Sequence, residues 1–246
     1  MLNSPLLSII IPAFNEEYRI INSLEIIDKY MGTMLFNWEV LIINDGSTDN
    51  TKNIIEEWIM HKHQFKVQTI EHQGKGAAVR YGILNSNSKY QFMCDADLSM
   101  PIDKISKFLN KMEEGYQIVI GSRQKTGAKR FNESIMRHIL GRLFNFLIKL
   151  ILVKNIEDTQ CGFKCFNSNI AKDLFKLQQI NGFAFDVEIL FLAQKNNIDI
   201  FELPIEWRHN DKSKVRIILD PLLMARDILY IFINNIKNKY PLIKSK

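Results

Sequence analysis

The sequence predicts an α/β fold with a mostly parallel central sheet and helices on its faces. Short apolar runs alternate with segments of helical periodicity through the first half of the chain, which is the pattern of a doubly wound sheet. Polar residues follow several of the apolar runs directly. In open α/β sheets ligands bind at the carboxyl ends of the strands, so the same pattern also predicts where the site lies.

Each predicted strand is a short β-rich run, as expected for strands that are buried on both faces. The first ends at a proline, and the fourth ends at two closely spaced aspartates. The five predicted strands are Leu6–Pro12, Trp38–Asp45, Lys66–His72, Tyr90–Asp97 and Tyr116–Arg123.

Four helices are predicted between these strands, from apolar residues that recur at spacings of three and four. They are Asn15–Met31, Thr51–His61, Gly74–Ser86 and Ile102–Glu114. Asn15 is a candidate cap for the first helix. A glycine opens the third, where outward-pointing backbone N–H groups could bind an anion.

Two later segments, Ser134–Val153 and Asp220–Lys246, are strongly apolar but interrupted by charges. The first is either an amphipathic helix in a membrane interface or a core helix packed on the sheet, and the segment alone favours neither. The presence of two such segments favours peripheral membrane attachment. Neither has about 18 consecutive apolar residues, so no membrane span is predicted. The predicted division is a domain of residues 1–215, followed by an amphipathic helix and basic tail, 216–246.

Composition sets broad limits on the class of protein. The 246 residues are 46% hydrophobic and 24% charged, which suits one sizeable globular domain. A net charge of +5 fits anionic partners such as nucleotide phosphates or acidic lipids, and no nucleic-acid partner is predicted. Three cysteines cannot complete a disulfide framework, so we expect a reducing compartment, with Cys161 and Cys165 as buried packing residues. The first residues lack a signal-peptide pattern.

Asp95 and Asp97 lie one residue apart after an apolar run. Two carboxylates this close repel each other unless a positive charge lies between them. Hard oxygen ligands favour Mg²⁺ or Mn²⁺, so one interpretation is a divalent-cation site. The alternative is a solvated turn in which Asp97 caps the next helix. The position of the pair at the end of a predicted strand favours the cation site.

Several motifs together resemble a known family. IIIPAFNEE, VLIINDGSTDNT, GKGAAVRYGI, CDADLS and GSR occur in the order found in family 2 inverting glycosyltransferases, whose fold is GT-A, the nucleotide-diphospho-sugar transferase fold. IEDTQCGFKCF, GFAFDVEIL and ELPIEWRHNDKSKV resemble the dolichyl-phosphate β-glucosyltransferase branch. The resemblance implies transfer of a hexose, with glucose as the expected sugar, from UDP to a polyprenyl phosphate. The product would be β-linked.

The resemblance also implies which residues bind the UDP-sugar donor. It places uridine contacts after the first strand and a hydrogen bond from Asp45 to the uracil ring. The glycine turn around Lys75 would meet phosphate, as would a later loop containing Lys214. The full set of implied donor contacts is Pro12, Ala13, Asn15, Glu16, Asp45, Lys75, Asp95, Ala96 and Lys214.

Four residues are implied to act at the reacting centre. Asp97 would hold the Mg²⁺ or Mn²⁺ ion directly, whereas Asp95 would be a second ligand or would face the ribose or sugar. Arg123 resembles an arginine that reaches phosphate, and Arg137 a second basic residue at the acceptor site. Asp186 has the position of a general base in many inverting relatives. A polyprenyl phosphate is already anionic, so we expect Asp186 to orient the sugar or a basic partner instead.

Trp207, Arg208, Ser213 and Lys214 are implied to form a strand and a loop that closes over the donor and excludes water. Location on the cytoplasmic side of a membrane is expected, with the oligomeric state open. One alternative enzyme acts on a hydroxyl of a cell-surface polysaccharide, with Asp186 as a true base. The other alternative is a nucleotide-sugar-binding protein without activity.

Overall fold

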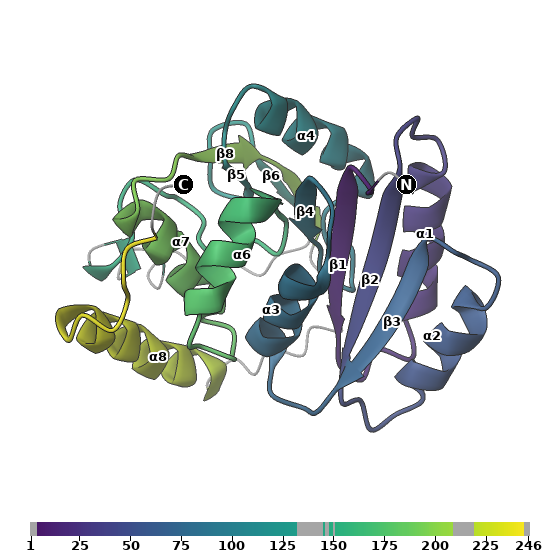
Figure 1. Ribbon diagram of the computed structural model, residues 1–246, viewed down its shortest axis with the longest axis horizontal. Coiled ribbons are helices and arrows are strands. Elements are labelled where there is room, and N and C mark those ends of the chain that lie inside the picture. Colours follow the sequence, from purple (N-terminus) through teal and green to yellow (C-terminus); the bar gives the residue numbers. More distant parts are fainter. Residues whose placement is uncertain (1–3, 132–144, 146–147, 150, 209–218, 244–246) are drawn as a thin grey trace.

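A seven-stranded, mostly parallel sheet forms the centre of the protein (Figure 1). The computed structural model describes residues 4–131, 145, 148–149, 151–208 and 219–243. The strand order is β3-β2-β1-β4-β7-β5-β8, and β7 is antiparallel to both of its neighbours. The strands are β1 (Leu7–Ala13), β2 (Trp38–Asp45), β3 (Phe65–Ile70), β4 (Tyr90–Met93), β5 (Ile118–Ser122), β7 (Lys164–Asn167) and β8 (Ile200–Pro204). A separate parallel pair joins β6 (Lys129–Phe131) to β9 (Glu206–Arg208).

Helices cover both faces of this sheet (Figure 1). One face packs against α3 (Lys75–Asn85), α6 (Ser168–Leu177), α7 (Phe185–Lys195) and α8 (Leu219–Ile236). The other packs against α1 (Ile20–Met31), α2 (Thr51–Ile59), the 3₁₀ turn η1 (Ile102–Lys104) and α4 (Ile105–Glu113). Strand β1 shows why the central runs are continuously apolar, since Ile10 packs on the first face and Ile9 and Ile11 on the second.

The predicted mostly parallel α/β sheet is confirmed, with two local corrections. The predicted cap at Asn15 is wrong: α1 begins at Ile20, and Asn15 has a φ of 54°, in the left-handed region. The fourth strand ends at Met93, before the aspartates, because the chain turns there and Leu98 also has a positive φ, 45°. Cys161 and Cys165 are buried and unpaired, as predicted, and so is Cys94.

Most of the apolar segment 134–153 lies outside the described residues. Of its described members, Ile148, Leu152 and Val153 are buried in the cluster that also contains α7, whereas Ile151 is exposed. Within the described part of the chain, every helix is too short or too polar to cross a membrane.

Candidate active site

The carboxyl ends of β1, β2 and β4 bring the predicted donor residues to one edge of the sheet. β1 pairs in parallel with β2 on one side, with Ala13 opposite Asn44, and with β4 on the other, with Ile10 opposite Met93. Pro12 and Ala13 are the last residues of β1. Asp45 ends β2, and Asp95 and Ala96 follow β4, so segments far apart in sequence meet at this edge.

The loop after β1 is tied to the turn after β2. The Asn15 side-chain oxygen accepts hydrogen bonds from the backbone nitrogens of Thr48, at 2.8 Å, and Asp49, at 3.4 Å. The Glu16 backbone nitrogen donates to the Thr51 hydroxyl at 2.7 Å, and its carboxylate pairs with Arg19. These bonds fix the backbone that would face uridine; the contacts of Asn15 and Glu16 with a nucleotide stay a prediction.

Asp45 organises the turn that precedes α3. Its carboxylate is buried, and its two oxygens accept hydrogen bonds from the backbone nitrogens of Gln73 and Gly74, both at 2.9 Å. Nδ1 of His72 lies 2.9 Å from Asp45 Oδ2, and the His72 ring stacks on Phe14 with centroids 4.1 Å apart. Asp45 therefore holds the turn in place, a role the sequence analysis missed. Its predicted hydrogen bond to uracil is not tested by this geometry.

Lys75 opens α3 and pairs with Asp95 across the edge of the sheet. The distance from Lys75 Nζ to Asp95 Oδ1 is 2.7 Å. Burial lowers the pKa of Lys75, but the Asp95 and Asp186 carboxylates outweigh it, so the pKa lies above its ordinary value. Gly74, just before Lys75, has a φ of 114°, which is favourable only for glycine. Lys75 is thus a charged ammonium at the mouth of a glycine turn.

The two aspartates lie in different electrostatic environments. Burial alone would raise the pKa of Asp95, but the Lys75 ammonium holds it below its usual range. The pKa of Asp97 is raised, first by burial and then by the charge of Asp95. Asp97 Oδ1 accepts a hydrogen bond from the Ser99 nitrogen at 3.1 Å, and Oδ2 lies 4.0 Å from an Arg19 nitrogen. The charge of Asp95 thus adds to the larger effect of burial on the pKa of Asp97, in the direction of the repulsion inferred from the sequence.

This pair has the chemistry of a partial site for a divalent cation. In the described residues, no group of three or more His, Cys, Asp or Glu side chains is placed to hold a metal. Asp95 and Asp97 offer hard carboxylate oxygens at an exposed edge, with side chains 30% and 21% exposed. Mg²⁺ is commonly held by one or two carboxylates together with substrate phosphates and water, so two aspartates fit such an ion.

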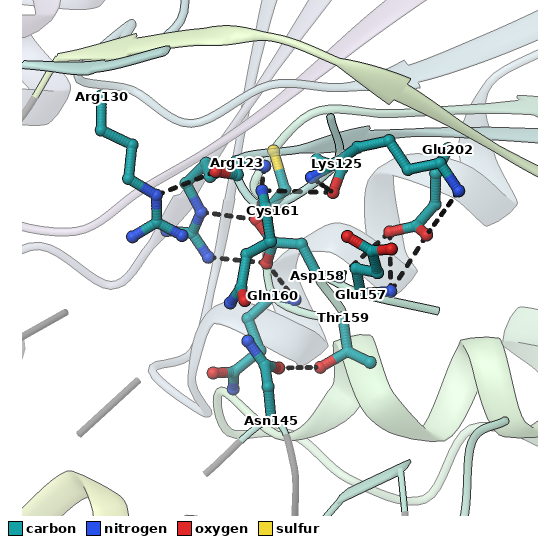
Figure 2. Close-up of polar contacts among 12 residues, drawn as sticks. Arg123, Lys125, Arg130, Asn145, Glu157, Asp158, Thr159, Gln160, Cys161 and Glu202 are labelled. Atoms are coloured by element: carbon teal, nitrogen blue, oxygen red, sulfur yellow. Dashed lines mark hydrogen bonds and ion pairs between the residues drawn. The ribbon is translucent and has the colours of Figure 1, made fainter. Parts of the chain in front are cut away.

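Arg123 follows β5 and is held by a buried carboxylate (Figure 2). Asp158 is fully buried and accepts hydrogen bonds from Arg123 Nε, at 2.7 Å, and Nη2, at 2.8 Å. The guanidinium lies over the Trp207 ring, 5.5 Å from its centroid. Burial opposes ionisation of Asp158, but Arg123 overcomes it and lowers the pKa of Asp158 to about 2. This two-bond pair fixes the guanidinium; its predicted contact with phosphate remains a prediction.

The segment around Asp158 is fixed from a second side as well (Figure 2). The Glu202 carboxylate on β8 accepts hydrogen bonds from the backbone nitrogens of Glu157 and Asp158, each at 3.0 Å. The Thr159 hydroxyl donates to the Asn145 side-chain oxygen at 2.9 Å. The segment around Asp158 is therefore held by hydrogen bonds with three side chains, those of Arg123, Glu202 and Asn145.

Asp186 lies on α7 and pairs with a lysine that the sequence analysis did not single out. Lys164, on β7, is 1% exposed, and its Nζ lies 2.6 Å from Asp186 Oδ1 and 2.6 Å from the Cys161 carbonyl oxygen. The pKa of Asp186 is raised by burial, which the nearby charges of Lys164 and Lys75 only partly offset. Asp186 therefore has a basic partner, Lys164, which it could orient; orienting such a partner is one of the two roles expected from the sequence.

Some predicted residues lie outside the described part of the chain: Arg137, Ser213 and Lys214. Trp207 and Arg208 are on β9, as expected for the strand that precedes the predicted closing loop. Arg208 lies over the Phe131 ring, 5.0 Å from its centroid. The roles of all five residues stay predictions.

The sequence is similar to a known protein family and to several known proteins. The family described as "Glycosyl transferase family 2" matches residues 8–175. The dolichyl-phosphate β-glucosyltransferase of Dictyostelium discoideum is 36% identical over 92% of this chain and 73% of its own length. Those of Saccharomyces cerevisiae and Homo sapiens are 34% and 32% identical, each over 92% of this chain and 73% and 74% of their own lengths.

Solved structures with the same fold confirm the GT-A prediction. Glucosyl-3-phosphoglycerate synthase of Mycobacterium tuberculosis with UDP superimposes with a TM-score of 0.67 at 18% identity, covering 98% of this chain and 82% of that one. The same enzyme with Mn²⁺, UDP-glucose and phosphoglyceric acid gives a TM-score of 0.68 at 15% identity, with the same coverage. At these identities the likeness concerns the fold alone.

Proposed function

The chain belongs to glycosyl transferase family 2, and from that premise we propose that it transfers glucose from UDP-glucose to a polyprenyl phosphate. The observation that carries the proposal is the similarity to dolichyl-phosphate β-glucosyltransferases over 92% of the chain. The predicted glycosyltransferase class is confirmed, and so is the resemblance to dolichyl-phosphate β-glucosyltransferases. The nucleotide, the lipid and the residue roles are the proposed parts.

The geometry of the sheet edge supports binding of a nucleoside diphosphate sugar. Asp45 holds the glycine turn, and Lys75 places one positive charge beside Asp95, where a diphosphate would need neutralisation. Asp97 and Asp95 are the residues that would hold Mg²⁺ or Mn²⁺. Such an ion, when bound, would act as a Lewis acid for the leaving UDP.

The acceptor chemistry explains why a strong base is not required. A phosphate oxygen of the lipid attacks the anomeric carbon of glucose, the bond from that carbon to UDP breaks on the opposite face, and the configuration inverts. Because the attacking phosphate is already an anion near neutral pH, no proton has to be removed. Asp186 is 3% exposed and bonded to Lys164, which suits an orienting residue. A hydroxyl acceptor would instead require Asp186 as a base, and its burial in an ion pair argues against that alternative.

We further propose that α8 attaches the protein peripherally to the cytoplasmic face of a membrane. The helix and its flank expose large apolar side chains, including Leu222 at 64% and Ile236 at 63%. Lys237 and Lys239 follow at its end and are exposed. An apolar helix face with adjacent lysines suits the interface of an anionic bilayer, where each lysine contributes roughly 1 kcal/mol.

Flotation with anionic vesicles at low and high salt tests this attachment. We expect wild type to float, less at high salt, and a variant with Leu222 and Ile236 changed to serine to float less. Wild type that stays with the soluble fraction at low salt contradicts membrane binding. A concentration-dependent dimer that the same substitutions dissociate would instead assign the helix face to a second copy.

The activity itself is tested by UDP release from UDP-glucose. The purified protein is assayed with Mg²⁺ or Mn²⁺ and one of three additions: dolichyl phosphate, dolichol without phosphate, or detergent alone. We expect fast release only with the phosphorylated lipid. Equal release with all three additions would mean that water or another acceptor is used. No binding of UDP-glucose at all would contradict the donor assignment.

A further inference from the structure

The loop between α6 and α7 sets the position of the glycine turn that carries Lys75. The Gln178 side-chain nitrogen donates to the Gly76 carbonyl at 3.0 Å, and the Ala77 nitrogen donates to the Asn181 carbonyl at 3.2 Å. A Cβ atom on Gly74 would lie 2.7 Å from the Asn181 carbonyl oxygen, so the two backbones are in close contact. A shift of the loop would therefore move the turn.

A buried carboxylate holds this loop. Glu188 on α7 is fully buried, and its Oε1 and Oε2 accept hydrogen bonds from the backbone nitrogens of Gln179 and Ile180, both at 2.9 Å. Hydrogen bonds in a site of low dielectric are stronger than those exposed to water, so these two bonds hold the loop firmly. Glu188 is thus linked through one loop to the turn at the sheet edge, although it does not lie in the site itself.

The same carboxylate binds the C-terminal segment. The Tyr240 hydroxyl donates to Glu188 Oε1 at 2.6 Å, and the Tyr240 ring is 2% exposed and packs edge-on against Phe191. Tyr240 lies four residues after the end of α8 at Ile236. A second bond runs from the Asn234 side-chain nitrogen on α8 to the Gln179 side-chain oxygen, at 2.8 Å. The loop is therefore held both by α7, through Glu188, and by α8, through Asn234.

We propose that Glu188 is a positioning residue for the donor-phosphate turn, and that Tyr240 couples the C-terminal segment to that turn through it. The inference rests on the proposed function, because it takes the turn at Lys75 as the phosphate site of UDP-glucose. Loss of the Tyr240 hydroxyl leaves Glu188 with one partner fewer, so the loop and the turn become less fixed. UDP-glucose then has to order them on binding, which weakens its affinity.

The test is a double-mutant cycle on UDP-glucose affinity, measured by calorimetry with Mn²⁺ and no acceptor. The variants are Tyr240→Phe, which keeps the ring, Glu188→Gln, which keeps the shape, and the double variant. We expect Kd to rise roughly threefold for Tyr240→Phe and roughly tenfold for Glu188→Gln. The double variant should be no weaker than Glu188→Gln alone, because the tyrosine acts through the glutamate.

A matched control separates positioning from general destabilisation. Ile231 on α8 is fully buried, so Ile231→Val lowers the melting temperature while leaving every bond to Glu188 in place. We expect its Kd to equal that of wild type. Unchanged Kd in Tyr240→Phe, additive effects in the cycle, or an equal loss in Ile231→Val would each overturn the proposal. If Glu188→Gln does not fold, the comparison of Kd between Tyr240→Phe and Ile231→Val decides the proposal alone. Failure of wild type to bind UDP-glucose would contradict the proposed function instead.

Discussion

Replacing Gly162 with alanine is expected to disable glucose transfer, because the Asp95 carboxylate lies directly against the glycine. A Cβ atom at position 162 would be 1.8 Å from Asp95 Oδ2 and 2.7 Å from Oδ1. Heavy atoms essentially never approach a Cβ within 3.0 Å, so the carboxylate or the loop must move by at least about 1.2 Å, the difference between 3.0 and 1.8 Å.

That displacement is large compared with the tolerance of a catalytic site. Asp95 also pairs with Lys75 at 2.7 Å, so the shift disturbs both the candidate metal site and the ammonium at the glycine turn. A misplacement of about 1 Å can cost roughly 10²-fold in rate. We therefore expect kcat/KM for glucose transfer to fall about 100-fold, together with a loss of stability of about 1–3 kcal/mol from overpacking.

The assay is transfer of labelled glucose from UDP-glucose to dolichyl phosphate, with the melting temperature measured in parallel. The matched control is Gly182→Ala in the loop before α7, where a Cβ meets its nearest atom, Asp227 Oδ2, at an ordinary 3.6 Å. Gly182→Ala should keep near wild-type activity. If kcat/KM of Gly162→Ala lies within threefold of the wild-type value, Asp95 does not have to occupy its observed position, and the reasoning is refuted.

Three further predictions concern single carboxylates and their partners. Asp97→Ala should abolish transfer at all Mg²⁺ and Mn²⁺ concentrations, and wild-type activity that survives a chelator would exclude the metal role. Lys164→Met should lower the free energy of unfolding in urea by about 3–5 kcal/mol, because it leaves the buried Asp186 unpaired. Adding Asp186→Asn to Lys164→Met should recover part of the lost free energy of unfolding. Equal stability of Lys164→Met and wild type would contradict a stabilising role of this ion pair. The pKa of Asp158 is lowered to about 2 by Arg123, so this pair stabilises the folded state above the ordinary carboxyl pKa. That contribution, about 2 kcal/mol, should be lost as pH falls from about 4 to about 2, and the Asp158→Asn variant should lack this pH dependence; an identical acid unfolding curve would count against the pair.

The strands that carry the candidate site could be predicted because their signals are local. β1, β2 and β4 are short apolar runs, each followed within a few residues by polar side chains, and both features lie within one stretch of sequence. β7 was missed for the opposite reason. It has only four residues and begins at Lys164, whose burial depends on Asp186, 22 residues further along the chain. Sequence alone gave no sign of that pairing.

The hydrogen-bond partners of the predicted site residues could not be predicted from local sequence patterns either. Asp45 and Asn15 are predicted from the sequence to contact the nucleotide, and the structure adds that both also bond backbone groups about 30 positions away. Glu188 carried a usable signal that was not followed. It stands in the apolar run GFAFDVEIL, and an acid within a buried apolar run requires a partner. An acidic residue in such a run indicates that a partner exists, but it does not identify the partner as Tyr240.

Transfer of glucose to a lipid phosphate with inversion is tested most directly by the structure of the product. Purified protein is incubated with UDP-glucose, Mn²⁺ and dolichyl phosphate, and the lipid product is extracted and examined by mass spectrometry and NMR. We expect one glucose attached through its anomeric carbon to the lipid phosphate, in the β configuration. An α-linked product, or glucose attached to a hydroxyl group instead of the phosphate, would contradict it.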